Sequence, residues 1–330
     1  MTSRAANITV GHPVAEADVS SVRSLVQRVM GTSFFKERHA ANVCQPPPVF
    51  SRERFWYVVI GCLLTTQQRS TKSSPVDRFM SQPSFPVSAR LCQEQDIESF
   101  ILECIQKFGG IRRGVTIARQ AADNWKKLND GQWAQAEKWF DRLLTQRSRE
   151  AQAGDFKLER EAANWADSTF AGLGPKQSRN LWQWLGLTRY EIPLDSRVTN
   201  WVNTSLTNKI ESKRLNDLKH YESVLDYLQT ICHKADALPC ELDAAAFDYE
   251  DLGFGSAKGP TTTESGFVNP NGQVTIRNTE LPGTDHNQYV YQIACSHCGQ
   301  IYGANGSDIF ERKCPACQGG RPGIPVLGGS

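Results

Sequence analysis

The stretch from Phe170 to Asn180, FAGLGPKQSRN, combines two glycines, a proline and a lysine in a pattern that could bind phosphate. Gly172 and Gly174 permit a tight turn because glycine tolerates positive φ angles. Pro175 suits the first position of a new helix, where its missing N–H costs nothing. The pattern predicts a helix-hairpin-helix whose second helix presents unpaired backbone N–H groups to a phosphate. An ordinary turn between two helices is the alternative interpretation.

Two other segments lie on either side of the hairpin. Residues 191–198 read EIPLDSRV, so that Asp195 follows Lys176 by nineteen residues. Upstream, an apolar run ends in LLTTQQ, whose last two residues are Gln67 and Gln68. Each has a plain structural interpretation: the lysine as a surface residue, the aspartate as a helix N-cap, and the glutamines as polar residues at a helix end. Their joint occurrence in this order argues for a function.

Together the three segments resemble the helix-hairpin-helix DNA glycosylases, of the 8-oxoguanine glycosylase and endonuclease III type. That family combines a Leu-Leu-x-x-Gln helix end, a Gly-x-Gly-x-Lys hairpin and a Val-Asp loop, and the resemblance covers roughly residues 50–240. It implies that Lys176 is the nucleophile, that Asp195 is the catalytic aspartate and that Gln67 fills the space left by an extruded base. The histidine that often follows the aspartate by two residues is here Arg197.

The resemblance implies a DNA N-glycosylase with abasic-site lyase activity, which binds double-stranded DNA and flips a damaged or modified base out of the helix. A lysine amine attacks the sugar carbon only when it is neutral. Its ordinary pKa is about 10.4, so partial burial must favour the uncharged form. A nearby carboxylate stabilises the positive charge that builds on the sugar. The base is not specified: an oxidised purine and a hypermodified base, as in viral DNA, are both compatible.

Two other functions fit the same motifs. The chain could be a non-catalytic module that recognises the shape of DNA and recruits other proteins. It could also be a glycosylase without lyase activity, in which Asp195 activates water and Lys176 only positions a phosphate. The further DNA contacts that we predict are hairpin glycines and polar or basic side chains near the three segments: Gln68, Arg69, Arg112, Arg113, Gly172, Gly174, Arg179 and Arg197. Ordinary solvated surface charge is the alternative for the arginines.

Two Cys-x-x-Cys pairs stand near the end of the sequence, separated by fifteen residues: Cys295 with Cys298, and Cys314 with Cys317. They offer four thiolates to one tetrahedral ion, for which Zn²⁺ is well suited, with iron as the alternative. Four protein ligands leave no open position. We therefore expect a structural zinc in a small β zinc ribbon that folds with its metal and contacts DNA or another protein.

Many endonuclease III relatives also hold an iron–sulfur cluster on four cysteines after the catalytic aspartate. In this sequence the corresponding region offers only Cys232 and Cys240. No iron–sulfur cluster is therefore expected.

The predicted fold is mainly α, with two lobes in the manner of the helix-hairpin-helix glycosylases and a small C-terminal β zinc ribbon. Apolar residues recur at helical spacing, and no alternating pattern occurs before residue 265. We predict an N-terminal segment packing with the second lobe (1–49), a central helical domain with the hairpin (50–190), a second helical lobe (191–245), a flexible acidic linker (246–285) and the ribbon (286–330).

The 330 residues carry a net charge of +2, which is unevenly distributed. Residues 241–285 sum to −6 and the first 240 residues to +7, a balance that permits a polyanionic partner without requiring one. We find no apolar run of about 18 residues and no signal-peptide pattern, and so expect neither a membrane span nor secretion. Six scattered cysteines then fit a reducing compartment. The expectation is an intracellular, DNA-associated monomer, in the cytoplasm or nucleoid if the cell is a prokaryote.

Overall fold

The structure is a computed structural model that describes residues 13–47, 49–66, 68, 73–93, 96–150, 155–251, 262–284 and 288–326. Two of the predicted DNA contacts, Gln67 and Arg69, lie outside the described residues. The chain divides into two compact units, residues 1–252 and residues 253–330.

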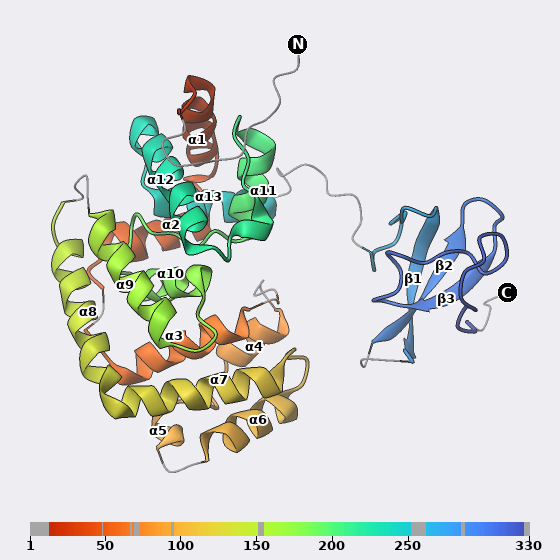
Figure 1. Cartoon of the computed structure of the whole chain (residues 1–330), viewed down its shortest axis with the longest axis horizontal. Helices are drawn as coiled ribbons and strands as arrows, with labels where there is room; N and C mark the ends of the chain where they lie inside the picture. Colours follow the sequence, from red (N-terminus) through yellow and green to blue (C-terminus); the bar gives the residue numbers. More distant parts are fainter. Residues whose placement is uncertain are drawn as a thin grey trace. The chain divides into compact units, whose positions relative to one another are not determined.

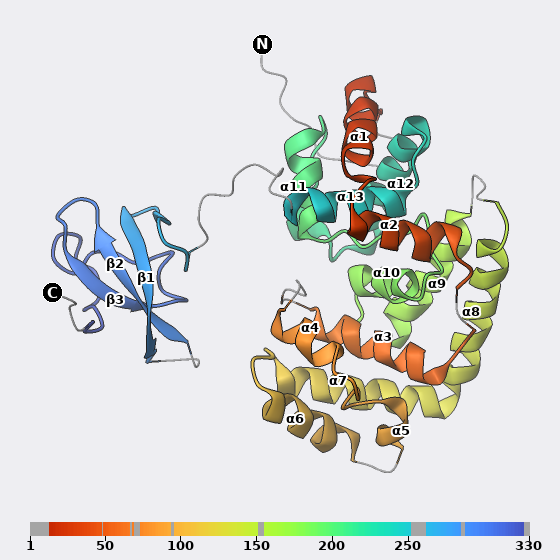
Figure 2. The same cartoon turned by 180° about the vertical axis from the view of Figure 1, so that it is seen from behind.

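The first unit is built of helices wherever its regular structure is described (Figures 1 and 2). In chain order they are α1 (Glu16–Val29), α2 (Ser33–His39), α3 (Arg52–Leu64), α4 (Pro75–Met80), α5 (Ala89–Cys92), α6 (Ile97–Phe108), α7 (Gly114–Lys127), α8 (Trp133–Arg147), α9 (Phe156–Thr169), α10 (Pro175–Trp184), α11 (Ser196–Ser205), α12 (Leu218–Ala235) and α13 (Pro239–Asp251). Short helical turns follow α2 and α7 and precede α12. The prediction of a mainly α fold is confirmed.

The larger hydrophobic core surrounds α3. The sequence of this helix is apolar on nearly every side, and nine of its residues are buried. Phe55 of α3 packs against Trp182 of α10, with ring centroids 6.0 Å apart, and both side chains are fully buried. A Cβ atom added at Gly61 would lie 2.7 Å from the ring of Trp184. A side chain at Gly61 would therefore push the helix that follows the hairpin away from α3.

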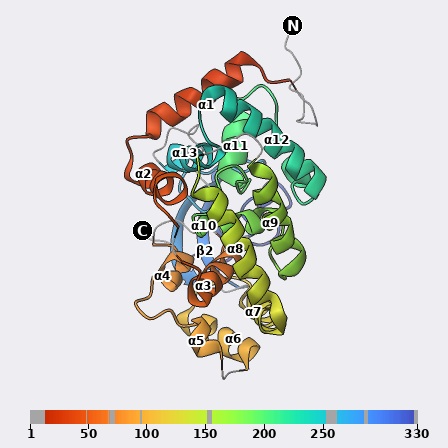
Figure 3. The same ribbon diagram turned by 90° about the vertical axis from the view of Figure 1, so that its left-hand side faces the viewer.

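A second core joins the N-terminal helices α1 and α2 to the helices that follow the hairpin. It contains buried apolar residues from Val19 to Phe35 and from Ile192 to Ala246. Figures 1 and 3 show α1, α11, α12 and α13 together at one end of this unit. The buried carboxylate of Asp18 on α1 accepts hydrogen bonds from the Thr207 backbone N–H at 2.8 Å and the Tyr227 hydroxyl at 2.7 Å. These bonds fix α1 to residues that are almost 200 positions away in the sequence.

The second unit contains a three-stranded antiparallel sheet in the order β1 (Gln273–Pro282), β2 (Tyr289–Cys295) and β3 (Ile301–Asn305). Its small core includes Ile293 and Tyr302, which face each other across β2 and β3. The prediction of a small C-terminal β region is confirmed.

The predicted boundaries of the acidic linker differ from the structure at both ends. Residues 246–251 continue α13, and residues 273–282 form β1 rather than linker. The glycines and acidic residues suggested an irregular segment. Buried Ala244, Ala245 and Ala246 give α13 an apolar face that packs into the second core, and this tertiary contact extends the helix. Among the described helices, none combines the length and the apolar character that a membrane span requires.

Candidate active site and metal centre

The predicted hairpin is present between α9 and α10. Gly172 has a φ angle of +80°, and a Cβ atom there would lie 2.8 Å from Leu63, so this position requires glycine. The side-chain amide of Asn124 on α7 donates to the Ala171 carbonyl at 3.0 Å and accepts from the Ala171 N–H at 2.7 Å. These contacts hold the turn against α7 and α3.

Gly174 plays a different part from the one that the sequence suggested. Its φ angle is −76°, which any residue adopts, and no atom lies within 4 Å of the position of an added Cβ. It is the N-cap of α10, and no side chain caps this helix. Glycine at this position therefore leaves open space in front of a helix N-terminus, rather than allowing an unusual backbone angle.

Lys176 is the second residue of α10 and is partly exposed. It lies close to α3. Burial raises the pKa of the Cys62 thiol on that helix, and the positive charge of Lys176 opposes the rise. The lysine therefore stands where the N-terminus of α10 meets α3, next to the uncapped N–H groups.

Asp195 is the N-cap of α11, as its plain structural interpretation proposed. Its Oδ1 atom accepts hydrogen bonds from the backbone N–H groups of Arg197 at 2.8 Å and Val198 at 3.0 Å. Its Oδ2 atom lies 3.9 Å from a guanidinium nitrogen of Arg197, and 23% of the side chain is exposed. The cap is thus made by Oδ1, whereas Oδ2 lies within ion-pair range of Arg197.

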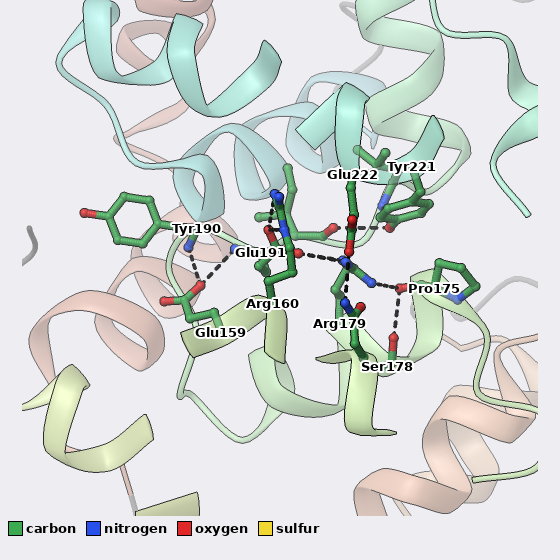
Figure 4. Close-up of polar contacts among 12 residues, drawn as sticks. Glu159, Arg160, Pro175, Ser178, Arg179, Tyr190, Glu191, Tyr221 and Glu222 are labelled. Atoms are coloured by element: carbon green, nitrogen blue, oxygen red, sulfur yellow. Dashed lines mark hydrogen bonds and ion pairs between the residues drawn. The ribbon is translucent and has the colours of Figure 1, made fainter. Parts of the chain in front are cut away.

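A buried network connects α10 to the loop that carries Asp195 (Figure 4). Arg179 Nε and Nη2 lie 2.9 Å and 2.8 Å from Glu191 Oε2, and both side chains are fully buried. Arg179 also donates to the Pro175 carbonyl at 3.0 Å. The prediction that Arg179 contacts DNA phosphate is therefore wrong for this structure, because its guanidinium is enclosed and already paired. Its role is to connect two segments: it is three residues from Lys176, and Glu191 is four residues from Asp195.

The same loop is held from two other helices. Glu191 Oε1 accepts two hydrogen bonds from Arg160 of α9, at 3.0 Å and 2.8 Å. Buried Glu159, also on α9, accepts the backbone N–H groups of residues 189, 190 and 191 at 2.7–2.9 Å. On the other side, the Tyr221 hydroxyl of α12 accepts the Leu194 N–H at 2.6 Å. Figure 4 shows these side chains converging on the loop from both sides. The backbone before Asp195 is thus fixed by side chains from two helices.

The structure adds Asp243 of α13, which the sequence reasoning missed. Burial raises the pKa of Asp243 to about 7, and the negative charge of Asp195 adds to the rise. The positive charges of Arg38 and Lys176 oppose it, as does a hydrogen bond from Gln183 Nε2 to Asp243 Oδ2 at 3.1 Å. Lys176 and Asp195 therefore each lie close enough to Asp243 for their charges to act on its carboxyl group. No local pattern marks Asp243, because it reaches this position only through the packing of α13.

Arg197 occupies the position where the resemblance leads one to expect histidine. Its guanidinium carbon lies 3.6 Å from the centroid of the Phe247 ring, and only 15% of the side chain is exposed. Phe247 in turn stacks on Phe34 with ring centroids 4.3 Å apart. Arg197 thus packs between Asp195 and Phe247 of α13, and Phe247 lies one helical turn from Asp243. The Arg197 side chain does not extend into solvent in the way that the predicted DNA contact suggests.

Two of the other predicted DNA contacts connect the loop after α3 to the loop before α7. Gln68 accepts a hydrogen bond from the Arg112 backbone N–H at 3.1 Å and donates to the Leu64 carbonyl at 2.6 Å. The Arg112 side chain is exposed, and Arg113 is partly exposed with a φ angle of +60°. Gln68 therefore joins the two loops, and the two arginines present positive charge beside it.

A cavity of about 630 Å³ lies elsewhere, between α9, α12 and α13. Its lining includes Phe156, Arg160, Tyr190, His233 and Glu241, and it contains neither Lys176 nor Asp195. This cavity is therefore separate from the residues that the sequence analysis singled out.

The four cysteines of the two pairs meet in the second unit. The sulfur atoms of Cys295, Cys298, Cys314 and Cys317 all lie within 4.8 Å of one another. The Cys295–Cys317 and Cys298–Cys314 sulfur pairs are each separated by 3.6 Å. A tetrahedral ion with metal–sulfur bonds of about 2.3 Å requires sulfur atoms about 3.8 Å apart, whereas a disulfide bond is far shorter. The four thiols could therefore bind one metal ion, as the spacing predicts.

Glycines allow each Cys-x-x-Cys turn to close. Gly299 follows the first pair with a φ angle of +75°, and its N–H donates to the Cys295 carbonyl at 2.9 Å. Gly319 follows the second pair with a φ angle of +63°. His297 lies inside the first turn but is not among the four grouped ligands. The four sulfur atoms thus form one compact group that could hold a single metal ion.

No protein-family model matches the sequence, and no curated protein matches it. The case for a function therefore depends on the residues and their arrangement.

Proposed function

We propose that the protein is a DNA glycosylase with abasic-site lyase activity. The observation that carries this proposal is that a partly exposed lysine and a partly exposed aspartate, from segments joined by a buried ion pair, lie in one charged cluster. The lysine stands at an uncapped helix N-terminus, which suits a backbone phosphate. Amine, carboxylate and phosphate-binding N–H groups are the parts that cleavage of a base from a DNA sugar requires.

In this proposal the Lys176 amine attacks the C1′ carbon of the sugar. The bond between C1′ and the base breaks, and its electron pair leaves with the base. The second oxygen of Asp195, Oδ2, stabilises the positive charge that develops on the sugar. The attached amine then loses a proton and the C1′–O4′ bond opens, with O4′ taking up a proton, so that a protonated Schiff base joins Lys176 to C1′. Loss of a proton from C2′ then expels the 3′ phosphate by β-elimination. Asp195 remains in position because its other oxygen caps α11.

The test is incubation of the protein with DNA duplexes that each carry one modified base. We expect free base and strand cleavage from at least one duplex. Oxidised purines and hypermodified bases belong in the panel because the residues do not select between them. If no duplex loses its base but all bind, the protein is the non-catalytic DNA-binding module instead.

The hairpin glycines give a test of the phosphate site. Gly172→Ala should destabilise the fold by about 1–2 kcal/mol or more, because alanine is strained at a positive φ angle and its methyl group meets Leu63. Gly174→Ala should cost less, about 0.5 kcal/mol, because its space is open and only the preference for glycine over alanine at an N-cap is lost. If a phosphate approaches Gly174, the added methyl group should displace it. Loss of about one hydrogen bond to a charged group would then weaken binding of an abasic-site duplex on the order of tenfold. Urea unfolding and fluorescence anisotropy measure the two effects, and unchanged DNA affinity in Gly174→Ala would count against the phosphate site.

We further propose that the four cysteines hold a structural zinc ion. Chelation of the metal should unfold the sheet of residues 273–305, because so small a core depends on the metal for its folding energy. The helical signal of the first unit should persist. Native mass spectrometry should find one zinc per chain, and hydrogen exchange should show loss of protection in β1, β2 and β3. Cys314→Ser should reproduce the loss, whereas Cys44→Ser, outside the group, should not; retention of zinc and protection by Cys314→Ser would contradict the assignment.

A further inference from the structure

Asp243 faces α10 through Gln183, which donates a hydrogen bond to its Oδ2 atom at 3.1 Å. Gln183 follows Lys176 by seven residues, or two helical turns, so both side chains leave the same face of α10. Their Cα atoms are about 10 Å apart along the helix axis. Asp243 is itself partly exposed, and no other described residue donates to its carboxyl group. A bound group can therefore reach it.

The separation along α10 decides what Asp243 can do. Direct proton transfer requires the two heavy atoms to approach within about 3.2 Å, or to be joined by one water. Among the described residues Asp243 forms no hydrogen bond or ion pair with Lys176, so we do not assign it the proton of the Lys176 amine. Asp243 is better placed to act on the departing base. When C1′ of the sugar lies beside Lys176 and the ring of the base lies along α10, the edge of the base farthest from C1′ lies next to Gln183 and Asp243.

The surroundings give Asp243 and Asp195 different roles. The charged groups that act on Asp243 are Asp195 at the start of α11, Arg38 of α2 and Lys176 of α10. Asp243 in turn lies close enough to Tyr221 of α12 and Cys240 of α13 for its charge to act on both. The pKa of Asp243 is raised to about 7, so it holds a proton in a good part of the molecules at neutral pH. Asp195 instead caps a helix N-terminus, where negative charge is stabilised. Two carboxyl groups in unlike environments are a recurrent arrangement of acid and base.

We propose that Asp243 is a further catalytic residue, the general acid that protonates the departing base; this inference rests on the proposed glycosylase function. As the bond between C1′ and the base breaks, its electron pair moves into the ring of the base. The proton of Asp243 passes to a ring nitrogen or carbonyl oxygen on the far edge, and the base leaves neutral. Asp243 is left as a carboxylate, which Gln183 and Arg38 stabilise, and it regains a proton from solvent. The substrate class is a neutral base with a hydrogen-bond acceptor on that edge.

The test separates base release from the chemistry that follows. Asp243→Asn keeps the size of the side chain and its acceptor for Gln183 but cannot give a proton. Duplexes carrying 8-oxoguanine, hypoxanthine, uracil or cationic 7-methylguanine serve as probes, and the neutral base that the unchanged protein releases fastest is chosen. We expect Asp243→Asn to slow single-turnover release of that base about a hundredfold or more. Cleavage of a preformed abasic-site duplex should be unchanged, because no base leaves, and release of 7-methylguanine, if the protein accepts it, should change little. Asp123→Asn, at an exposed aspartate of α7, is the matched control.

The pH dependence gives a second readout. Asp243 is protonated below its pKa of about 7, so the ratio of the unchanged protein's rate to that of Asp243→Asn should be largest below pH 7 and fall as the pH rises through 7. Equal rates of base release in both proteins would overturn the proposal while the glycosylase function stands. Equal loss of base release and abasic-site cleavage would show a merely structural role and would also overturn it. If the unchanged protein acts on neither kind of duplex, the proposed function itself fails.

Discussion

Lys176→Gln should abolish covalent trapping of the protein on DNA by borohydride. Borohydride reduces the Schiff base between an amine and C1′, and glutamine has no amine that can form one. We expect the trapped fraction on an abasic-site duplex to fall a thousandfold or more, the order of loss seen when an enzyme's nucleophile is removed. Gel electrophoresis after borohydride treatment measures it. The fold should persist because Lys176 is partly exposed at a helix start.

The control for this prediction is Lys126→Gln, which removes an exposed lysine from α7 and should leave trapping intact. Two outcomes distinguish the other hypotheses. Base release by Lys176→Gln without trapping would indicate a glycosylase without lyase activity, in which Asp195 activates water; Asp195→Asn should then lose base release. Trapping of Lys176→Gln at the original level would place the nucleophile elsewhere and would contradict our assignment.

Glu191→Gln should strongly destabilise the first unit. The carboxylate is fully buried and is shared by Arg179 and Arg160. Removing it leaves the Arg179 guanidinium enclosed without its counter-charge, which costs about 3–5 kcal/mol in comparable buried pairs. Urea unfolding measures the loss. Abasic-site cleavage should fall with it, because the pair joins the segment of Lys176 to the segment of Asp195.

The exposed pair of Arg142 and Glu161 is the matched control. Its atoms lie 3.4 Å apart and both side chains are well exposed, so Glu161→Gln should cost less than about 1 kcal/mol. Combining Glu191→Gln with Arg179→Met should recover part of the lost stability, because the unpaired charge is removed as well. A cost below about 1 kcal/mol for Glu191→Gln would show that the pair is not the connection that we infer.

Several parts of the molecule could be predicted from the sequence because they depend on neighbouring residues. Apolar residues at helical spacing predicted a mainly helical chain before residue 265, and the Gly-x-Gly-Pro pattern predicted the turn before α10. The spacing of the two Cys-x-x-Cys pairs predicted the four-sulfur group. Asp195 was predicted both as a cap and as a catalytic residue; the structure contains the cap, and the catalytic role remains a prediction.

Other parts could not be predicted because they depend on which helix faces meet. Arg179 looked like a surface cation because a polar residue near the start of a helix usually faces solvent. Its burial follows from Glu191, which the chain brings back against α10. Asp243 carried no signal, since its surroundings combine Arg38 from α2, Gln183 from α10 and Asp195 before α11. The start of the linker was misplaced for the same reason: packing of α13 into the second core overrode the local preference of its residues.

By itself, then, the sequence determined the helices, the hairpin turn and the four-cysteine group, because backbone preferences and the spacing of cysteines act over a few residues. Only the tertiary structure decided that Arg179 is internal, that Gly174 serves for space and not for its φ angle, and that Asp243 joins Lys176 and Asp195. The physical reason is that desolvation and charge pairing depend on every element that packs around a group, and those elements come from distant parts of the chain.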